Sequence, residues 1–216
     1  MTAELKSRLY DLAAAGPLLA CYGLGVCVQF TLLLANLESG GGWLEICSPL
    51  SNIVFLGLLM TLLAIRCPPV RKARGIVPRV AAVFGLLAPI FVLAPPKAKL
   101  TLATVTFSSV ITLVGVVASI AICLWLGRSF SIFPQARALV TTGPYRLVRH
   151  PLYVAELTAL FGRAWALEAP WSLIVMCVAI AAQLPRMHFE EQVLTEAFPS
   201  YRDYASRTAR LIPGLY

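Results

Sequence analysis

Six long apolar segments constrain what this chain can fold into more than any other feature of its sequence. They are approximately Leu12–Leu34, Pro49–Ile65, Val80–Leu93, Leu100–Leu126, Leu152–Leu167 and Trp171–Leu184. A helix that spans a bilayer needs about 20 apolar residues, so the shorter segments need their flanks to complete a span. Each segment must be helical inside lipid, because an unpaired backbone amide costs several kcal/mol there. We therefore predict an all-α, polytopic membrane helix bundle of about six transmembrane helices.

The composition supports a membrane protein and argues against nucleic-acid binding. Hydrophobic residues make up 59% of the chain and charged residues 13%, whereas charged residues are about 25% of soluble proteins. The net charge of +8 comes from short basic clusters between the apolar segments. These clusters form no continuous basic face with interleaved aromatic residues, as a nucleic-acid surface would. We expect membrane lipids, and no nucleic acid, among its partners.

The distribution of basic residues predicts how the chain is oriented. Lys and Arg gather before the first apolar segment, in the second and fourth loops and in the C-terminal tail, whereas the opposite side has Lys97 and Lys99. Cytoplasmic loops are enriched in Lys and Arg. Both termini, and the loop that ends at Arg149 and His150, are therefore expected to face the cytoplasm.

The stretch from Gly143 to Tyr153, with the sequence GPYRLVRHPLY, puts two arginines, a histidine and two tyrosines at the edge of an apolar segment. Gly-Pro is typical of a turn, and Pro151 suits the first position of a helix because its missing N–H would be unpaired there. A helix N-terminus has unpaired backbone donors and a partial positive charge, to which nearby arginines add. We interpret this stretch as the reaction site, an anion-attracting pocket at the membrane edge.

One face of the fifth apolar segment is polar well into the bilayer. Steps of four and three residues put the following side chains on that face: Arg149, Tyr153, Glu156, Leu160 and Arg163. A charge near the bilayer centre costs at least about 2.5 kcal/mol and has to face the protein interior or a wet cavity. Glu156 and Arg163 are equally compatible with a functional role and with a structural one. The structural role would be a pair with a neighbouring helix for Glu156, or snorkelling to the far interface for Arg163.

A second polar cluster follows at the end of the sixth segment. It consists of Arg186, His188, Glu190 and Glu191. The short turn at residues 168–170 makes the fifth and sixth segments an antiparallel hairpin, which returns this cluster to the side of Arg149. Two carboxylates that face arginines at a membrane mouth suit a zwitterionic, partly cationic cofactor. A salt-bridged helix end would have the same spacing.

The C-terminal tail is predicted to form a short amphipathic helix at the cytoplasmic membrane surface. The chain becomes polar after Pro185, and residues 187–206 put apolar side chains on one helical face by steps of four and three. Such a face lies well on lipid. Pro199 should break this helix into two pieces.

The residues that commonly bind metal ions are too dispersed to form a site. His150 and His188 are the only histidines, and the six cysteines form no C-x-x-C pair. Metal-binding motifs space their Cys and His ligands closely. We predict no metal.

Several motifs together resemble the isoprenylcysteine carboxyl methyltransferase family. They are GPYRLVRHPLY at 143–153, the pair Glu190 and Glu191, the tail residues Leu194, Phe198, Tyr201 and Tyr204, and the ending RLIPGLY at 210–216. The resemblance covers roughly Leu126 to Tyr216 and is specific, because motif order, hairpin length and tail spacing agree. It implies an integral membrane enzyme that takes S-adenosylmethionine from the cytosol and methylates a lipophilic or prenylated substrate from the bilayer, most simply an isoprenylcysteine-type carboxylate. The chain then divides into N-terminal transmembrane helices at 1–127, with four spans, and a catalytic, S-adenosylmethionine-binding region at 128–216.

The resemblance also assigns roles to individual residues. The cofactor-binding residues that it implies are Tyr145, His150, Pro151, Tyr153, Glu190 and Glu191. The resemblance places Arg149 at the cofactor pocket, and Arg186 matches an arginine near the transferred methyl and the substrate carboxylate. We expect both to be catalytic, because either arginine could orient an acidic acceptor by a bidentate contact. Two positions depart from the family pattern. Phe189 stands where many relatives have Arg, which bears on carboxylate recognition, and Pro199 stands where the usual residue is Gly, which bears on tail geometry.

Three other functions stay open at the level of the sequence. A phospholipid N-methyltransferase would share cofactor and topology but act on an amine, which prefers a carboxylate to an arginine near the methyl. A sterol-reductase-like NADPH enzyme has a similar HP-x-Y turn and R-x-x-PG tail, but it tends to have Arg-Asp where this chain has Glu190 and Glu191. A membrane scaffold or small transporter would use Glu156, Arg163 and Gln183 for packing or permeation. It gives no reason to gather the two polar clusters on one side.

Overall fold

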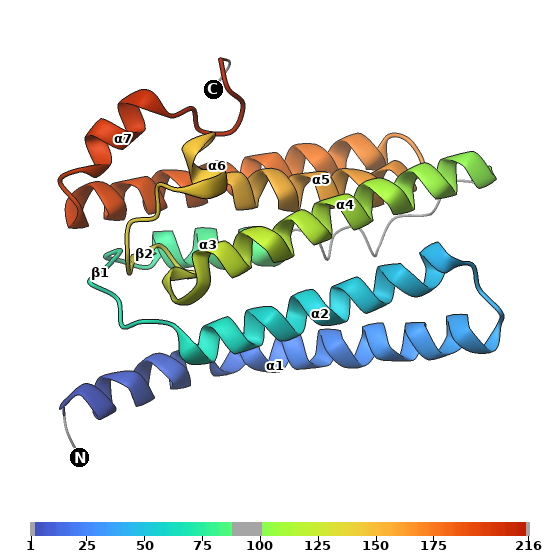
Figure 1. The fold of residues 1–216 in the computed structure, drawn as a ribbon, viewed down its shortest axis with the longest axis horizontal. Helices are drawn as coiled ribbons and strands as arrows, with labels where there is room; N and C mark the ends of the chain where they lie inside the picture. Colours follow the sequence, from blue (N-terminus) through green and yellow to red (C-terminus); the bar gives the residue numbers. More distant parts are fainter. Residues whose placement is uncertain (1–2, 88–100, 215–216) are drawn as a thin grey trace.

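The computed structural model describes residues 3–87 and 101–214, with side chains at 15–85 and 101–214. The part of the predicted third span after Leu87, the basic residues Lys97 and Lys99, and the last two residues of the tail motif lie outside the described residues. The described part is an elongated helix bundle (Figure 1). The prediction of an all-α membrane bundle is confirmed.

Seven α-helices make up most of the described chain. They are α1 (Ala3–Glu38), α2 (Trp43–Ile65), α3 (Val77–Leu87), α4 (Leu102–Leu126), α5 (Pro151–Trp165), α6 (Trp171–Ala197) and α7 (Tyr201–Arg207). The connections contain short 3-10 helices at Gly127–Ser129 and Gly143–Arg146, and two short antiparallel strands, β1 (Arg71–Lys72) and β2 (Gln135–Ala136). Figure 1 shows β1, β2 and α7 at the end of the bundle where α2, α4 and α6 finish and α5 begins. We call it the loop end.

Four helical stretches are long and apolar enough to cross a membrane. They are Ala15–Glu38, Trp43–Ile65, Leu102–Ser129 and Trp171–Ala197. α5 has 15 residues, which corresponds to about 22 Å of helix and falls short of the hydrocarbon core. The described part of α3 has 11 residues. The predicted number of about six spans is therefore supported for four of them, and α5 is a shorter helix packed against α4 and α6.

Two glycines let α4 and α5 approach each other closely. A Cβ built on Gly115 of α4 would lie 2.3 Å from the backbone nitrogen of Ala159, and one on Gly162 of α5 would lie 2.5 Å from that of Thr112. Ser108 of α4 also donates a hydrogen bond to the carbonyl of Gly162 at 2.7 Å. Small residues at membrane helix interfaces allow this approach and the interhelical hydrogen bonds that go with it. The contact joins the predicted regions 1–127 and 128–216 in one bundle and fixes which face of α5 is turned inward.

The sixth helix is longer than the sequence predicts. The expected span ends at Leu184, but α6 continues through Pro185 to Ala197 as one helix. Proline removes one backbone hydrogen bond, and membrane helices tolerate it where neighbouring elements compensate; here α3 packs along α6. The predicted break at Pro199 is confirmed, because α6 ends before it and α7 begins at Tyr201.

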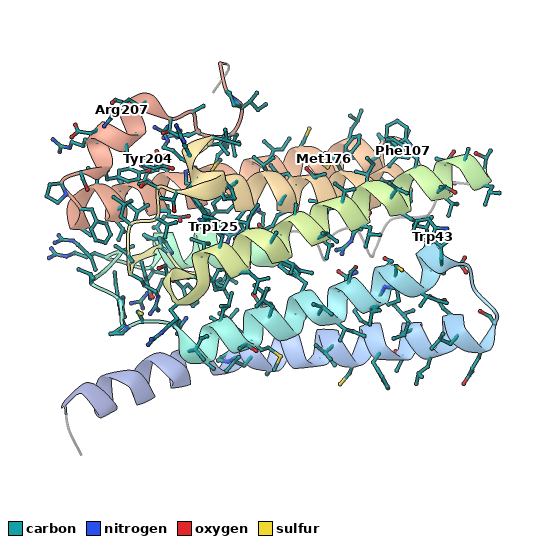
Figure 2. The ribbon with its side chains drawn as sticks, viewed as in Figure 1. Trp43, Phe107, Trp125, Met176, Tyr204 and Arg207 are labelled. Atoms are coloured by element: carbon teal, nitrogen blue, oxygen red, sulfur yellow. The ribbon has the colours of Figure 1, made fainter. Side chains whose placement is uncertain are left out.

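A buried apolar cluster packs next to the loop end. Its members come from α1, α2, α4 and the loop after α4: Leu18, Tyr22, Leu59, Leu62, Leu63, Cys123, Phe130 and Ile132. Figure 2 shows Trp125 near this end and Trp43 at the opposite end of the bundle from Tyr204. The loop after α4 is therefore anchored by buried apolar side chains.

Candidate active site

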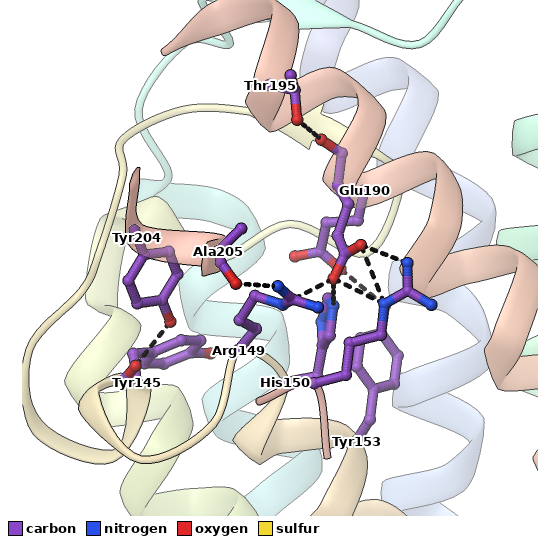
Figure 3. Close-up of polar contacts among 10 residues, drawn as sticks. Tyr145, Arg149, His150, Tyr153, Glu190, Thr195, Tyr204 and Ala205 are labelled. Atoms are coloured by element: carbon purple, nitrogen blue, oxygen red, sulfur yellow. Dashed lines mark hydrogen bonds and ion pairs between the residues drawn. The ribbon is translucent and has the colours of Figure 1, made fainter. Parts of the chain in front are cut away.

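The two polar clusters predicted from the sequence meet around the carboxylate of Glu191. His150 Nε2 lies 3.0 Å from Glu191 Oε1, and Arg149 Nε lies 3.1 Å from the same oxygen. Arg210 donates to Glu191 Oε2 from Nε at 3.0 Å and from Nη2 at 2.6 Å. Figure 3 shows Arg149 and His150 directed toward the glutamates of α6. Charge-assisted and bidentate contacts of this kind are stronger than neutral hydrogen bonds.

Residues 208–210, which we call the C-terminal strap, pair with the backbone that precedes α5. Val148 and Ala209 form a parallel β-bridge. The amide of Arg149 donates to the carbonyl of Ala209 at 2.8 Å, and that of His150 donates to the carbonyl of Arg210 at 3.1 Å. Arg210 had no role in the sequence prediction, although it begins the tail motif that carried part of the family resemblance. The strap holds the tail onto the predicted reaction site.

Glu190, the neighbour of Glu191, has a different environment. Tyr153 of α5 donates its hydroxyl hydrogen to Glu190 Oε2 at 2.9 Å. The guanidinium carbon of Arg186 lies 5.0 Å from the centre of the Tyr153 ring, in cation–π contact. These three side chains connect α5 and α6 just inside the loop end.

The turn before α5 is fixed by a glycine and by α7. Gly143 has φ +59°, and a Cβ there would lie 2.3 Å from the ring of Trp125, so the tight turn suits glycine alone. Tyr204 of α7 donates its hydroxyl hydrogen to the backbone carbonyl of Tyr145 at 2.6 Å. Burial raises the pKa of Tyr204 to about 12 and raises that of Tyr145 further above its usual range. Both phenols are neutral hydrogen-bond donors at physiological pH.

Glu156 is held by α6, one helical turn beyond Tyr153. Gln183 donates to Glu156 Oε2 at 3.1 Å and accepts from Arg186 Nη1 at 2.9 Å. The same Arg186 nitrogen lies 3.9 Å from Glu156 Oε2. The structure thus gives Glu156 the contact with a neighbouring helix that was one of its two possible roles.

Arg163 does not extend to the far interface. Its Nη2 donates to Oδ1 of Asn52 on α2 at 2.8 Å. The guanidinium therefore turns inward across the bundle, and snorkelling does not describe it. Asn52 was not singled out by sequence reasoning, because its partner lies on another helix, whereas Gln183 was named only for the scaffold or transporter alternative.

A cavity of about 420 Å³ connects these groups. The whole polar face predicted for the fifth segment lines it: Arg149, Tyr153, Glu156, Leu160 and Arg163. Tyr145, His150, Arg186 and Glu190 line it as well, whereas Pro151 and Glu191 do not. Arg163 follows Tyr153 by ten residues, so this wall of the cavity runs about 15 Å along α5. Its volume is within the usual range for sites that bind small molecules.

The deeper walls of the cavity come from the first helices of the bundle. Tyr22 and Gln29 of α1, Asn52 of α2 and Ser119 of α4 line it together with apolar neighbours. The cavity thus has a charged mouth at the loop end and a mixed apolar and polar interior at membrane depth. His188, a member of the predicted second cluster, is not among its lining residues. No group of three or more His, Cys, Asp or Glu in the described ranges could hold a metal ion.

Comparisons with known proteins give a family match and relatives of part of the chain. Residues 99–200 match the family model described as phospholipid methyltransferase. Part of the chain is 40% identical over 78 residues to the cobalt-zinc-cadmium resistance protein CzcN of Cupriavidus metallidurans. It is 35% identical over 82 residues to the nickel-cobalt-cadmium resistance protein NccN of Alcaligenes xylosoxydans xylosoxydans. The matched segments cover 36% of the chain and of the first relative, and 38% of the chain and of the second, so they span less than half of either relative.

Proposed function

Residues 99–200 belong to the phospholipid methyltransferase family, and on this premise we propose that the chain transfers a methyl group from S-adenosylmethionine to a lipophilic acceptor in the membrane. The observation that supports this most is the cavity. Its mouth is lined by Arg149, His150 and Glu190, and its interior lies among helices long enough to cross a bilayer. A polar cofactor would enter at the mouth, and a lipophilic acceptor would occupy the membrane side. We propose that the mouth faces the cytoplasm, as the basic residues predict.

The residues at the mouth fit S-adenosylmethionine. Glu190 Oε2 accepts from Tyr153, which leaves Oε1 for the cofactor's ammonium group or ribose hydroxyls. The hydroxyl of Tyr201 is buried without a hydrogen-bond partner in the described residues, and Tyr201 lines the cavity beside Leu194 and Tyr204. A buried hydroxyl usually has a partner, and an adenosine would supply one while its base packs on these apolar and aromatic side chains.

Methyl transfer from S-adenosylmethionine requires no covalent intermediate with the protein. The cofactor supplies an electrophilic methyl on a sulfonium, so no nucleophilic side chain is required. What the chain must do is align donor and acceptor and exclude water. Carboxylates too close to the sulfonium would stabilise the ground state, which is why we assign Glu190 to the amine or ribose end.

Glu191 has a different role in this proposal. Its two oxygens are occupied by Arg149, His150 and Arg210, and it does not line the cavity. We assign it the positioning of the loop before α5, on which Arg149 and His150 stand, instead of a direct contact with the cofactor.

Two acceptor classes are compatible with this site. The motif resemblance favours an isoprenylcysteine-type carboxylate, which Arg186 or Arg149 would orient by a bidentate contact. The family match favours a phospholipid amine, and one specific observation agrees with it. Glu156 lines the cavity beyond Arg186, where an amine would find a carboxylate.

Transfer of label from radioactive S-adenosylmethionine tests the proposal. Purified protein in lipid nanodiscs should convert label into material that organic solvent extracts. Arg186→Ala should lower single-turnover rate more than cofactor affinity, whereas Glu190→Ala should weaken cofactor binding in calorimetry. Glu196→Gln is the matched control, since Glu196 pairs with Arg71 on the exposed surface. No extractable label from the wild type would refute the activity, and the reverse ranking of the two variants would refute the role assignment.

A further inference from the structure

Two carboxylates, Glu190 and Glu156, line the described part of the cavity, one at its mouth and one further inside. Glu190 is at the mouth, hydrogen-bonded to Tyr153. Glu156 is three residues further along α5 than Tyr153, which is a rise of about 4.5 Å toward the membrane interior. Arg186 stacks on Tyr153 and approaches Glu156, so it lies between the two acids. If the cofactor occupies the mouth, Glu156 is the first carboxylate on the acceptor side.

The contacts of Glu156 orient it and leave one oxygen available. Gln183 donates to Oε2, and Arg186 lies 3.9 Å from that same oxygen. Gln183 is fixed in turn by accepting from Arg186. Neither contact uses Oε1. A carboxylate held through one oxygen, with the other free toward a cavity, has the geometry of a general base.

Ionisable side chains from four helices lie around Glu156. Those that face it are Arg186 and Glu190 of α6, Tyr153 on its own helix, Tyr22 of α1 and Cys123 of α4. Arg186 is the cation among them, and its Nη1 lies 3.9 Å from Glu156 Oε2. A negatively charged acceptor would have to approach Glu156 against like-charge repulsion, whereas an acceptor that carries a proton would be attracted to it.

We propose that Glu156 takes the proton from the attacking atom of the acceptor, and hence that the acceptor is a lipophilic amine or thiol and not a carboxylate. This rests on the proposed function. The acceptor's lone pair forms the new bond to the methyl carbon while the carbon–sulfur bond breaks and its electron pair stays on sulfur. The N–H or S–H proton passes to Glu156 Oε1, and the products are the methylated acceptor and S-adenosylhomocysteine. A carboxylate acceptor has no such proton to lose.

The test compares three lipophilic acceptors in nanodiscs: N-acetyl farnesylcysteine, whose amine is blocked, a dialkyl phosphatidylethanolamine and a long-chain alkyl thiol. Wild-type protein should methylate the amine or the thiol in preference to the carboxylate, and the preferred probe tells these two sources of the proton apart. Its rate should fall as the pH is lowered and Glu156 becomes protonated. Preferred methylation of the carboxylate of N-acetyl farnesylcysteine would overturn the inference.

Variants of Glu156 give a second, independent readout. Glu156→Gln should lower kcat at least about 100-fold, the usual share of a general base, remove the acid limb of the pH profile and leave the KM for S-adenosylmethionine unchanged. Glu156→Asp should recover part of the rate. Glu196→Gln, on the exposed surface of α6, should behave as wild type. S-adenosylhomocysteine binding shows that each variant is folded. An unchanged kcat in Glu156→Gln overturns the inference alone, whereas failure of the wild type to bind S-adenosylhomocysteine overturns the proposed function.

Discussion

Replacing Glu191 by Gln should loosen the C-terminal strap from the loop that carries Arg149 and His150. The carboxylate is hydrogen-bonded to His150 and Arg210 and forms an ion pair with Arg149, and three of its contacts come from Arg210. In Glu191→Gln, one acceptor oxygen remains and the other is replaced by an NH2 group. That NH2 group is itself a donor, so it cannot accept from the nitrogen that faces it. At least one of these donors therefore loses its partner.

The size of the effect follows from burial. The exposed fractions of the side chains are 14% for Glu191, 15% for Arg149 and 3% for His150, while Arg210 is 27% exposed. A hydrogen bond to a charged group contributes about 1.5–3 kcal/mol when buried. Because Arg210 is partly solvated, we expect a loss of about 2 kcal/mol, which corresponds to a change of about 30-fold in the strap's opening equilibrium.

Hydrogen exchange measures that opening directly. The amides of Arg149 and His150 donate to the strap, so their exchange should accelerate about 30-fold in Glu191→Gln. Glu190→Gln should leave their exchange unchanged, although it weakens cofactor binding. Equal protection of these amides in wild type and Glu191→Gln, or an equal loss in both variants, would refute the division of labour between the two glutamates.

Three further predictions concern packing and the tail. Gly115→Ala would bring a Cβ to 2.3 Å from the backbone of α5 and should lower the thermal stability in detergent by about 1–3 kcal/mol; Gly57→Ala, with open space around it, should not. Gly85→Ala would bring a Cβ to 2.3 Å from Arg186 Cδ, so turnover should fall about 10- to 100-fold while S-adenosylhomocysteine affinity stays the same. Tyr204→Phe should weaken the docking of α7, measured by proteolysis of the tail. Because burial raises the pKa of Tyr204 from near 10 to about 12, wild-type docking should be constant below pH 10 and weaken between pH 10 and 12.

The features that the sequence predicted well are those set by local periodicity. Pro151 begins α5 because its ring and missing N–H suit the first helical turn. The polar residues of α5 face the cavity because steps of four and three residues return to the same side of a helix. The family match at 99–200 confirms the resemblance drawn from the motifs.

The features that the sequence could not supply depend on contacts between distant elements. The pair Asn52 and Arg163 joins residues 111 positions apart, and no local pattern links them. The strap pairs the end of the chain with the loop before α5. The continuation of α6 past Pro185 depends on packing that propensity does not contain.

The different surroundings of Glu190 and Glu191 could have been predicted from helix geometry alone. Glu190 and Glu191 are consecutive residues of a helix, so their side chains diverge by about 100°. The two side chains therefore leave the helix in different directions. The structure turns Glu190 toward the cavity and Glu191 toward the strap.

The central claim is that the cavity mouth receives S-adenosylmethionine. Isothermal titration of the purified protein with S-adenosylhomocysteine and, separately, with NADPH tests it most directly, because these ligands divide the methyltransferase function from the reductase alternative. We predict saturable binding of S-adenosylhomocysteine that Glu190→Ala weakens, and no binding of NADPH. Binding of NADPH without S-adenosylhomocysteine would contradict the account.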